Sequence, residues 1–283
     1  MIKKIKVSTY TNSDHKRDHR ALNELALKLN RASLLVTLYG WKSDVEKDRI
    51  QHSVVGSHIL SALNSISSII SLTQKLSLQV REAILLSRGV YETLLVGAFC
   101  SVDDGERAKR AMLHSVYKTV RSQTQHAIFG SLQVKVEKTH RIDRKNPKVI
   151  EAMTLFGGSS NIRPCFPESR TNMISAIEAK DKTASLLFSG VEVMIYDLAS
   201  EIVHGSYYAF ETFNASPERQ LETLQAHYQT AHYAIFLSTA AFCRSIRASM
   251  VPPDFFEDLE KFAIETLKVH APEAFDEDNM GND

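Results

Sequence analysis

The sequence predicts an all-α protein, a bundle of about eight to nine helices. Three observations support this fold class. The first 146 residues contain no proline, the strongest helix breaker, and they are rich in leucine, alanine, lysine and serine. Two stretches, 81–100 and 183–206, are apolar around most of a helical cylinder, and this pattern predicts that the helix over 183–206 is buried on nearly all sides. Residues 156–168 are rich in glycine, serine and proline, which is typical of a hinge between two helical parts.

The N-terminal half is expected to hold a short arm followed by four helices. In order, these segments are an arm over 1–12 and helices over 13–38, 44–72, 77–100 and 106–128. Serine and aspartate, the residues that best cap helix N-termini, stand near each start: Ser13 or Asp14, Asp44, Ser77, and Asp103 with Asp104. The helix over 106–128 is basic and amphipathic.

After the hinge, the C-terminal half is expected to hold an apolar helix, two further helices and an acidic tail. These segments are 183–206, 217–249, 252–270 and 273–283. Gly205 follows the apolar helix as a left-handed C-cap, which would place His204 at the negative end of the helix dipole. Prolines open the two later helices. We therefore expect one helical domain over 13–272, in two halves that meet near 156–168.

Composition indicates a soluble protein of the reducing cytoplasm. The chain is 43% hydrophobic and 24% charged, and its three cysteines, Cys100, Cys165 and Cys243, are too few and too dispersed for a disulfide framework. No secretory leader is evident at the start, and the apolar runs are interrupted before they reach the length of a membrane span. Lysine and arginine exceed aspartate and glutamate by only one, 34 against 33, so no overall positive field indicates a nucleic-acid-binding protein.

One local segment, 130–148, is strongly basic. Two interpretations remain open: a solvated helix face that continues into a loop, or a ridge that contacts the phosphates of RNA. The RNA-binding candidates are Lys135, Lys138, Arg141, Arg144 and Lys145.

Several kinds of chemistry have no motif in this sequence. It contains no phosphate-binding loop, dinucleotide fingerprint, zinc-protease motif, hydrolase elbow or EF-hand loop. His15 and His19 have a spacing that metals accept, but no third ligand stands near them, so exposed polar side chains are the better interpretation. We expect neither a cofactor nor a metal.

Two apolar helices each carry an unexpected polar stripe. Arg88 and Glu92 lie one turn apart on the first helix, and Tyr196, Ser200 and His204 lie at successive turns of the second. One interpretation is a buried polar network that fixes the helix register. The other is a catalytic cluster in an apolar cleft, able to hold an anion or move protons.

A second arginine–histidine pair stands on the basic helix, where Arg121 and His126 are five positions apart. This spacing resembles the R-x4-H pattern of HEPN ribonucleases, which are helical nucleases. The resemblance implies metal-free RNA cleavage, with the histidine handling protons at the 2′-OH and the arginine steadying the scissile phosphate. Ser122 departs from the Asn, Asp or His that usually follows the arginine. The alternative is two exposed polar residues on an amphipathic helix.

A wider resemblance covers roughly residues 77–208. The two apolar helices read Ser87-Arg88-x-x-Tyr91-Glu92 and Tyr196-x-Leu198-x-Ser200-x-x-x-His204-Gly205-Ser206. Together they resemble an uncharacterised bacterial family of all-helical proteins with R-x-x-x-E on one apolar helix and S-x-x-x-H-G on another. That family is distantly similar to HEPN-type bundles. The resemblance implies a fold and a candidate pocket, but no reaction.

Two functional hypotheses follow. The first is a metal-independent ribonuclease that acts as a toxin or anti-phage effector, with His204 or His126 as general acid/base and Arg88 or Arg121 holding phosphate. It predicts a homodimer and allows for a partner protein such as an antitoxin. The second is a non-catalytic helical module that binds a small ligand or a protein, with the Arg/Glu/His stripes as a structural network.

Overall fold

The computed structural model describes residues 10–121, 124–129, 131–137, 143–157, 164–213, 217–250 and 253–270. Within them the chain forms a helical bundle, as predicted, although the helices run from α1 to α11 instead of numbering eight or nine. In chain order the elements are α1 (Asn12–Lys42), α2 (Glu46–Leu72), α3 (Val80–Ser101), α4 (Glu106–Arg121), β1 (Thr124–Phe129), β2 (Leu132–Glu137), α5 (Pro147–Phe156), α6 (Arg170–Glu178), α7 (Lys182–Val191), η1 (Glu192–Tyr196), α8 (Asp197–Val203), α9 (Tyr207–Phe213), α10 (Pro217–Arg247) and α11 (Pro253–Lys268).

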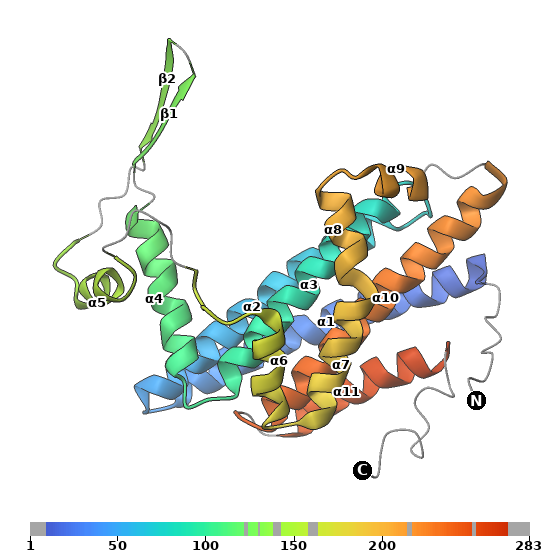
Figure 1. Ribbon diagram of the computed structural model, residues 1–283. Helices are drawn as coiled ribbons and strands as arrows, with labels where there is room; N and C mark the ends of the chain where they lie inside the picture. The colour runs from blue at the N-terminus through green and yellow to red at the C-terminus, as the bar shows by residue number, and fades with distance from the viewer. Residues whose placement is uncertain are drawn as a thin grey trace.

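Helix α3 forms the centre of the bundle and packs against both α2 and α10 (Figure 1). Helix α1 packs on α2, and α11 packs on α10. Fully buried aliphatic and aromatic side chains from four helices fill this core: Leu22, Leu25 and Leu29 of α1, Ile59 and Ile66 of α2, Val90 and Leu94 of α3, and Phe236 and Phe242 of α10. Because burial of one such side chain contributes about 1.5–3 kcal/mol, this core is the main source of stability.

Helices α4 and α5 pack on each other at one end of the bundle and share a small separate core, made of Leu113, Tyr117, Ala152 and Phe156. The expected hinge follows α5. Residues 158–163 lie outside the described residues, whereas Phe166, just beyond them, packs edge-on against Phe99 in the main core at 5.2 Å between ring centroids. The division into two halves therefore stays a prediction.

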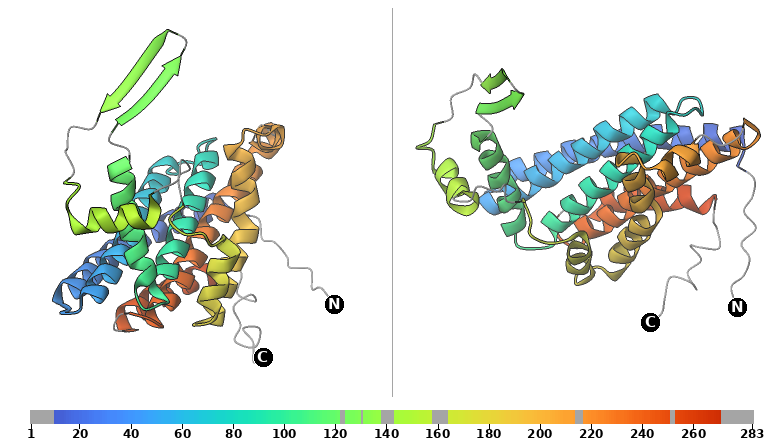
Figure 2. Two further views of the ribbon diagram at one scale, coloured as in Figure 1. Left: turned by 60° about the vertical axis from the view of Figure 1, so that its left-hand side comes forward. Right: turned by 45° about the horizontal axis from the view of Figure 1, so that its top comes forward.

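The helix expected over 106–128 is shorter than predicted, because α4 ends at Arg121 and the chain continues as a β-hairpin. In the hairpin, His126 pairs with Lys135, and Phe129 pairs with Leu132. The sequence Gly130–Ser131 between the strands is typical of a two-residue hairpin turn, and alternating apolar residues flank it. Both figures draw the hairpin away from the bundle, beyond α4 (Figure 1, Figure 2).

The apolar segment expected over 183–206 is three consecutive helical elements, α7, the π-helical turn η1 and α8. The expectation that it is buried on nearly all sides is wrong. Leu186, Val193 and Val203 are exposed, because this segment lies on the outside of the bundle and packs with one face on α3 and α10. Its C-terminus is as predicted. Gly205 has φ +62°, and the amides of Gly205 and Ser206 donate to the carbonyls of Ile202 and Glu201, which is the Schellman arrangement.

Among the described residues, α2 and α3 are each long and apolar enough to cross a membrane by length and composition. The most apolar window of α3 is 61% buried inside the bundle, and that of α2 is 33% buried. A buried core helix can have the same composition as a membrane span. The composition of α2 and α3 therefore does not distinguish a core helix from a membrane-spanning helix. The cytoplasmic location and the lack of membrane contact therefore stay predictions.

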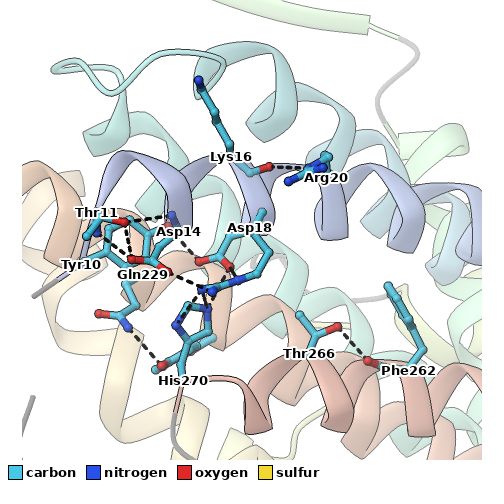
Figure 3. A network of polar contacts seen from close by, with 12 residues as sticks. Tyr10, Thr11, Asp14, Lys16, Asp18, Arg20, Gln229, Phe262, Thr266 and His270 are labelled. Atoms are coloured by element: carbon cyan, nitrogen blue, oxygen red, sulfur yellow. Dashed lines mark hydrogen bonds and ion pairs between the residues drawn. The ribbon is translucent and has the colours of Figure 1, made fainter. Parts of the chain in front are cut away.

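A buried polar cluster joins the two ends of the described chain, where α1 meets the residues that follow α11 (Figure 3). Asp18 accepts hydrogen bonds from the Tyr10 hydroxyl and from Nε2 of His270, each at 2.8 Å. Thr11 caps α1 in a capping box with Asp14, two to three residues before the predicted cap. Tyr10, placed in the arm by the sequence, is therefore part of the bundle, while residues 1–9 and the acidic tail over 273–283 lie outside the described residues.

Candidate functional site

The two predicted polar stripes meet at Arg88. Its Nε donates to Oε1 of Glu92 at 2.9 Å, one turn along α3. Across the helix interface, Nη1 donates to the Ser200 hydroxyl at 3.1 Å and Nη2 to the Tyr196 hydroxyl at 3.0 Å. The guanidinium therefore ties α3 to η1 and α8 through two hydrogen bonds, and a third holds it to Glu92 on its own helix. Four of the five residues predicted for this site are in direct contact.

A second arginine completes the site. The Arg170 guanidinium, from the start of α6, lies 3.6 Å from the centroid of the Tyr196 ring, and the Arg88 guanidinium lies 4.1 Å from the same centroid. Both cations contact the electron-rich ring of Tyr196, an arrangement worth about 0.5–2 kcal/mol per cation according to its exposure.

Glu192 neutralises the second cation. Its carboxylate accepts from Nε of Arg170 at 2.9 Å and from the hydroxyl of Tyr91 on α3. Burial, then this hydrogen bond, raises the pKa of Tyr91, so its hydroxyl remains a donor. Burial would lower the pKa of Arg170, but the Glu192 carboxylate outweighs it and the pKa is raised. We call these seven residues the Arg88 cluster: Arg88, Tyr91, Glu92, Arg170, Glu192, Tyr196 and Ser200.

The π-helical turn η1 positions this cluster, because it begins with Glu192 and ends with Tyr196. A π turn widens the helix by one residue per turn and is frequently found at functional positions. The net formal charge of the cluster is zero, since two arginines face two glutamates. The Arg88 side chain is 19% exposed, whereas that of Glu92 is 40% exposed. Glu92 is thus the charged group on α3 through which the cluster reaches solvent.

A groove of about 500 Å³ lies beside Glu92, between α2 and α3. Its lining residues are Ser57, His58 and Ser61 of α2 and Gly89, Glu92, Thr93 and Val96 of α3. Oε1 of Glu92 faces Arg88, and Oε2 has no hydrogen-bond partner among the described residues. Glu92 therefore belongs to both the Arg88 cluster and the groove.

His58 is the titratable group that α2 contributes to the groove. Its Nδ1 lies 2.7 Å from the carbonyl of Val54 and donates to it, so in the neutral ring Nε2 is an acceptor. Burial lowers the pKa of His58, although the carbonyl of Val54 opposes this effect, and the neutral form is favoured. A β-carbon at Gly97 would lie 3.1 Å from Cβ of His58, so the glycine makes room for the histidine between the helices.

His204, predicted as a catalytic residue, does not join the Arg88 cluster. It is the exposed C-cap of α8, and its ring has no hydrogen bond or ion pair with any described residue. Three residues of the site were not predicted from the sequence: Arg170, Glu192 and His58. Glu192 could have been found, because it stands one turn before Tyr196 in the same stripe.

The second constellation is divided between two elements, since Arg121 ends α4 and His126 lies in β1. They are not on one helix as predicted, and their side chains lie outside the described part of the molecule. Of the RNA-binding candidates, Arg144 and Lys145 are exposed in the turn before α5, Lys135 lies in β2, and Lys138 and Arg141 lie outside the described residues.

The histidine pair on α1 has a structural role, and the expectation that both side chains are exposed is wrong, since His15 is buried and His19 half-buried. Nε2 of His15 contacts the carbonyl of Thr73 and Nε2 of His19 that of Ile70, each at 2.9 Å, so both rings satisfy the C-terminal end of α2. No group of three or more metal-binding side chains occurs in the described ranges. Cys100 and Cys243 are buried free thiols, and Cys165 is half-buried.

Compared with protein-family models, with curated proteins and with solved structures, the chain has no match. The resemblance to HEPN-type proteins and to the R-x-x-x-E and S-x-x-x-H-G family therefore stays a prediction.

Proposed function

We propose that this chain is a non-catalytic helical binding module, in which the Arg88 cluster fixes α3 against η1 and α8 and presents Glu92 to the groove. The observation that carries this proposal is the engagement of Arg88. Its guanidinium already makes three hydrogen bonds within the protein, and the charges of the cluster cancel. Three of the five N–H donors of Arg88 are already engaged, and Glu92 and Glu192 offset the two arginines, so the site lacks the net positive surroundings that a phosphate clamp needs.

The experiment that tests this proposal is substitution of Arg88. Arg88→Ala leaves Glu92, Ser200 and Tyr196 without their shared donor, and we expect it to lower the free energy of unfolding by about 1–3 kcal/mol. Arg88→Lys keeps the charge but loses the planar fork of donors, so its free energy of unfolding should lie between those of the wild type and Arg88→Ala. Chemical denaturation measures both effects.

The matched control is Arg81→Ala, on the exposed first turn of the same helix. The side chain of Arg81 is exposed and has no hydrogen bond or ion pair among the described residues, so this variant should stay within about 0.5 kcal/mol of wild type. An Arg88→Ala protein as stable as the Arg81→Ala protein would contradict the proposal.

A second candidate function is the HEPN-like ribonuclease, acting as a toxin or anti-phage effector. The observation that favours it is the projecting hairpin, in which His126 stands opposite Lys135, with exposed Arg144 and Lys145 in the turn before α5. Basic residues on a projecting element supply sequence-independent affinity for nucleic acid.

Induction of the wild-type chain in a bacterial host, beside His126→Ala and His204→Ala, tests the ribonuclease. Growth arrest with new RNA fragments, abolished in one folded histidine variant, supports it and selects the catalytic histidine. Unchanged RNA in all three cultures opposes it. A homodimer and an antitoxin partner would be tested next if the wild-type chain arrests growth and cleaves RNA.

A further inference from the structure

The groove beside the Arg88 cluster offers hydrogen-bond acceptors. The free Oε2 of Glu92 is one, and Nε2 of His58 is another, because Nδ1 of His58 already donates to Val54. The hydroxyl of Ser57 donates to the carbonyl of Ser53 at 2.8 Å, which leaves its oxygen lone pairs available. A ligand that satisfies these groups must donate hydrogen bonds, and the carboxylate favours a positive charge.

The shape of the groove adds a second requirement. At Gly89 no atom lies within 4 Å of the position that a β-carbon would occupy, so the groove is open there, one turn before Thr93. Val96 provides an apolar surface one turn beyond Glu92. A short methylene chain lying over Gly89 would bring a charged end to Glu92 on the next turn of α3, with Val96 as the apolar surface beyond it.

From this arrangement we propose that the α2–α3 groove binds an aliphatic primary amine, whose ammonium group donates to Glu92 and His58. The inference rests on the proposed binding function and names its ligand class. An ammonium group carries three donors and no acceptor, which complements this set of acceptors. Such an amine could be a free diamine or the side chain of a lysine, and the two share this chemistry.

Calorimetric titration of the purified full chain tests the inference with three probes. Putrescine represents the free diamine, Nα-acetyl-lysine amide represents the lysine side chain, and 1,4-butanediol is the uncharged analogue of putrescine. We expect saturable binding of at least one amine and at least tenfold weaker binding of the diol. The preferred amine shows which source the groove takes. Equal binding of diol and amine, or no saturable binding of either amine, would overturn the inference.

Two variants place the binding in the groove. Glu92→Gln keeps the shape but removes the charge, and Gly89→Leu keeps the charge but fills the open position one turn from Glu92. Each variant should bind the amine at least tenfold more weakly than the wild type does. The control is Gly190→Leu on α7, where a β-carbon also meets nothing within 4 Å, outside the groove. If Glu92→Gln does not fold, the affinity of Gly89→Leu for the amine still tests whether the amine binds in the groove. Unchanged amine affinity in Gly89→Leu would overturn the inference.

The two proposals can fail separately. Destabilisation of Arg88→Ala without amine binding would leave the binding module in place and exclude this ligand class. Amine binding that Gly89→Leu abolishes, in a protein that tolerates Arg88→Ala, would support the groove and exclude the structural role of the cluster.

Discussion

The carboxylate of Asp18 and the imidazole of His270 are joined by a 2.8 Å hydrogen bond between residues 252 positions apart. The Asp18 side chain is 1% exposed and also accepts from the Tyr10 hydroxyl and, at 3.2 Å, from Nε of Arg17. Burial would raise the pKa of Asp18, but the hydrogen bond from His270, the nearby His232 and the bond from Tyr10 outweigh it, so the pKa is lowered. The charged carboxylate thus holds the start of α1 to the residues after α11.

We predict that Asp18→Asn lowers the free energy of unfolding by about 2–3 kcal/mol, because it removes the charged acceptor of the hydrogen bonds from Tyr10 and His270 inside the bundle. The pKa is lowered in the folded state, so this stabilisation is present above the unfolded pKa near 4 and is lost as pH falls through the folded value. Urea denaturation at pH 7 measures the effect. Glu24→Gln on the exposed face of α1 is the control, and an Asp18→Asn protein equal to it would contradict this account.

His232 is predicted to make the protein less stable in mild acid. It is fully buried, neither ring nitrogen has a hydrogen-bond partner among the described residues, and burial lowers its pKa to about 4. Between pH 6.5 and 4 the unfolded chain therefore binds a proton that the folded chain does not, which costs about 3 kcal/mol of stability across that range. Unfolding free energies at pH 7 and pH 4.5 measure this loss.

The variant His232→Phe isolates the effect. The ring lies between Tyr228 and Phe236, so phenylalanine keeps the packing and removes the titration. Burial also lowers the pKa values of His15, His58 and His227, and these contribute with the same sign in both proteins. A wild type and a variant with equal loss between the two pH values would show that His232 is not responsible.

The meeting of the two polar stripes could be predicted because each stripe follows the helical repeat. Residues four apart on an apolar helix share a face, and a buried charge needs a partner on the adjacent helix. Arg170 could not be found in this way, since it begins a short helix after a loop and no periodic pattern relates it to Tyr196. His204 was included because the stripe was extended one turn too far, past the last helical residue, Val203.

For the fold as well, features that follow a periodic pattern could be predicted and features without one could not. The long helices were predictable from apolar spacing and proline placement, as the boundaries of α10 show. The hairpin was missed because α4 is basic and amphipathic, and this pattern was extended into residues with alternating apolar positions. A short strand pair at the end of such a helix gives only a weak local signal.

Two substitutions of Tyr196 should separate the stability that its ring contributes to the Arg88 cluster from the stability that its hydroxyl contributes. Tyr196→Phe removes the hydroxyl that accepts from Arg88 but keeps the ring against both guanidinium groups, and we expect a loss of about 1 kcal/mol. Tyr196→Ala removes the ring too and should cost at least about 1 kcal/mol more. Both are measured by denaturation. Equal losses would show that the two arginines gain nothing from the ring.

Two glycines near the cluster should respond in opposite directions to alanine. Gly190 lies in α7 with nothing within 4 Å of its missing β-carbon, so Gly190→Ala should stabilise the protein by about 0.5–1 kcal/mol through lower entropy of the unfolded chain. Gly205 has equally open surroundings, but its φ of +62° disfavours a β-carbon, so Gly205→Ala should destabilise by about 1 kcal/mol. Because space is the same at both positions, the difference between the two measured free energies reports the backbone conformation alone. The same sign for both variants would contradict the left-handed C-cap of α8.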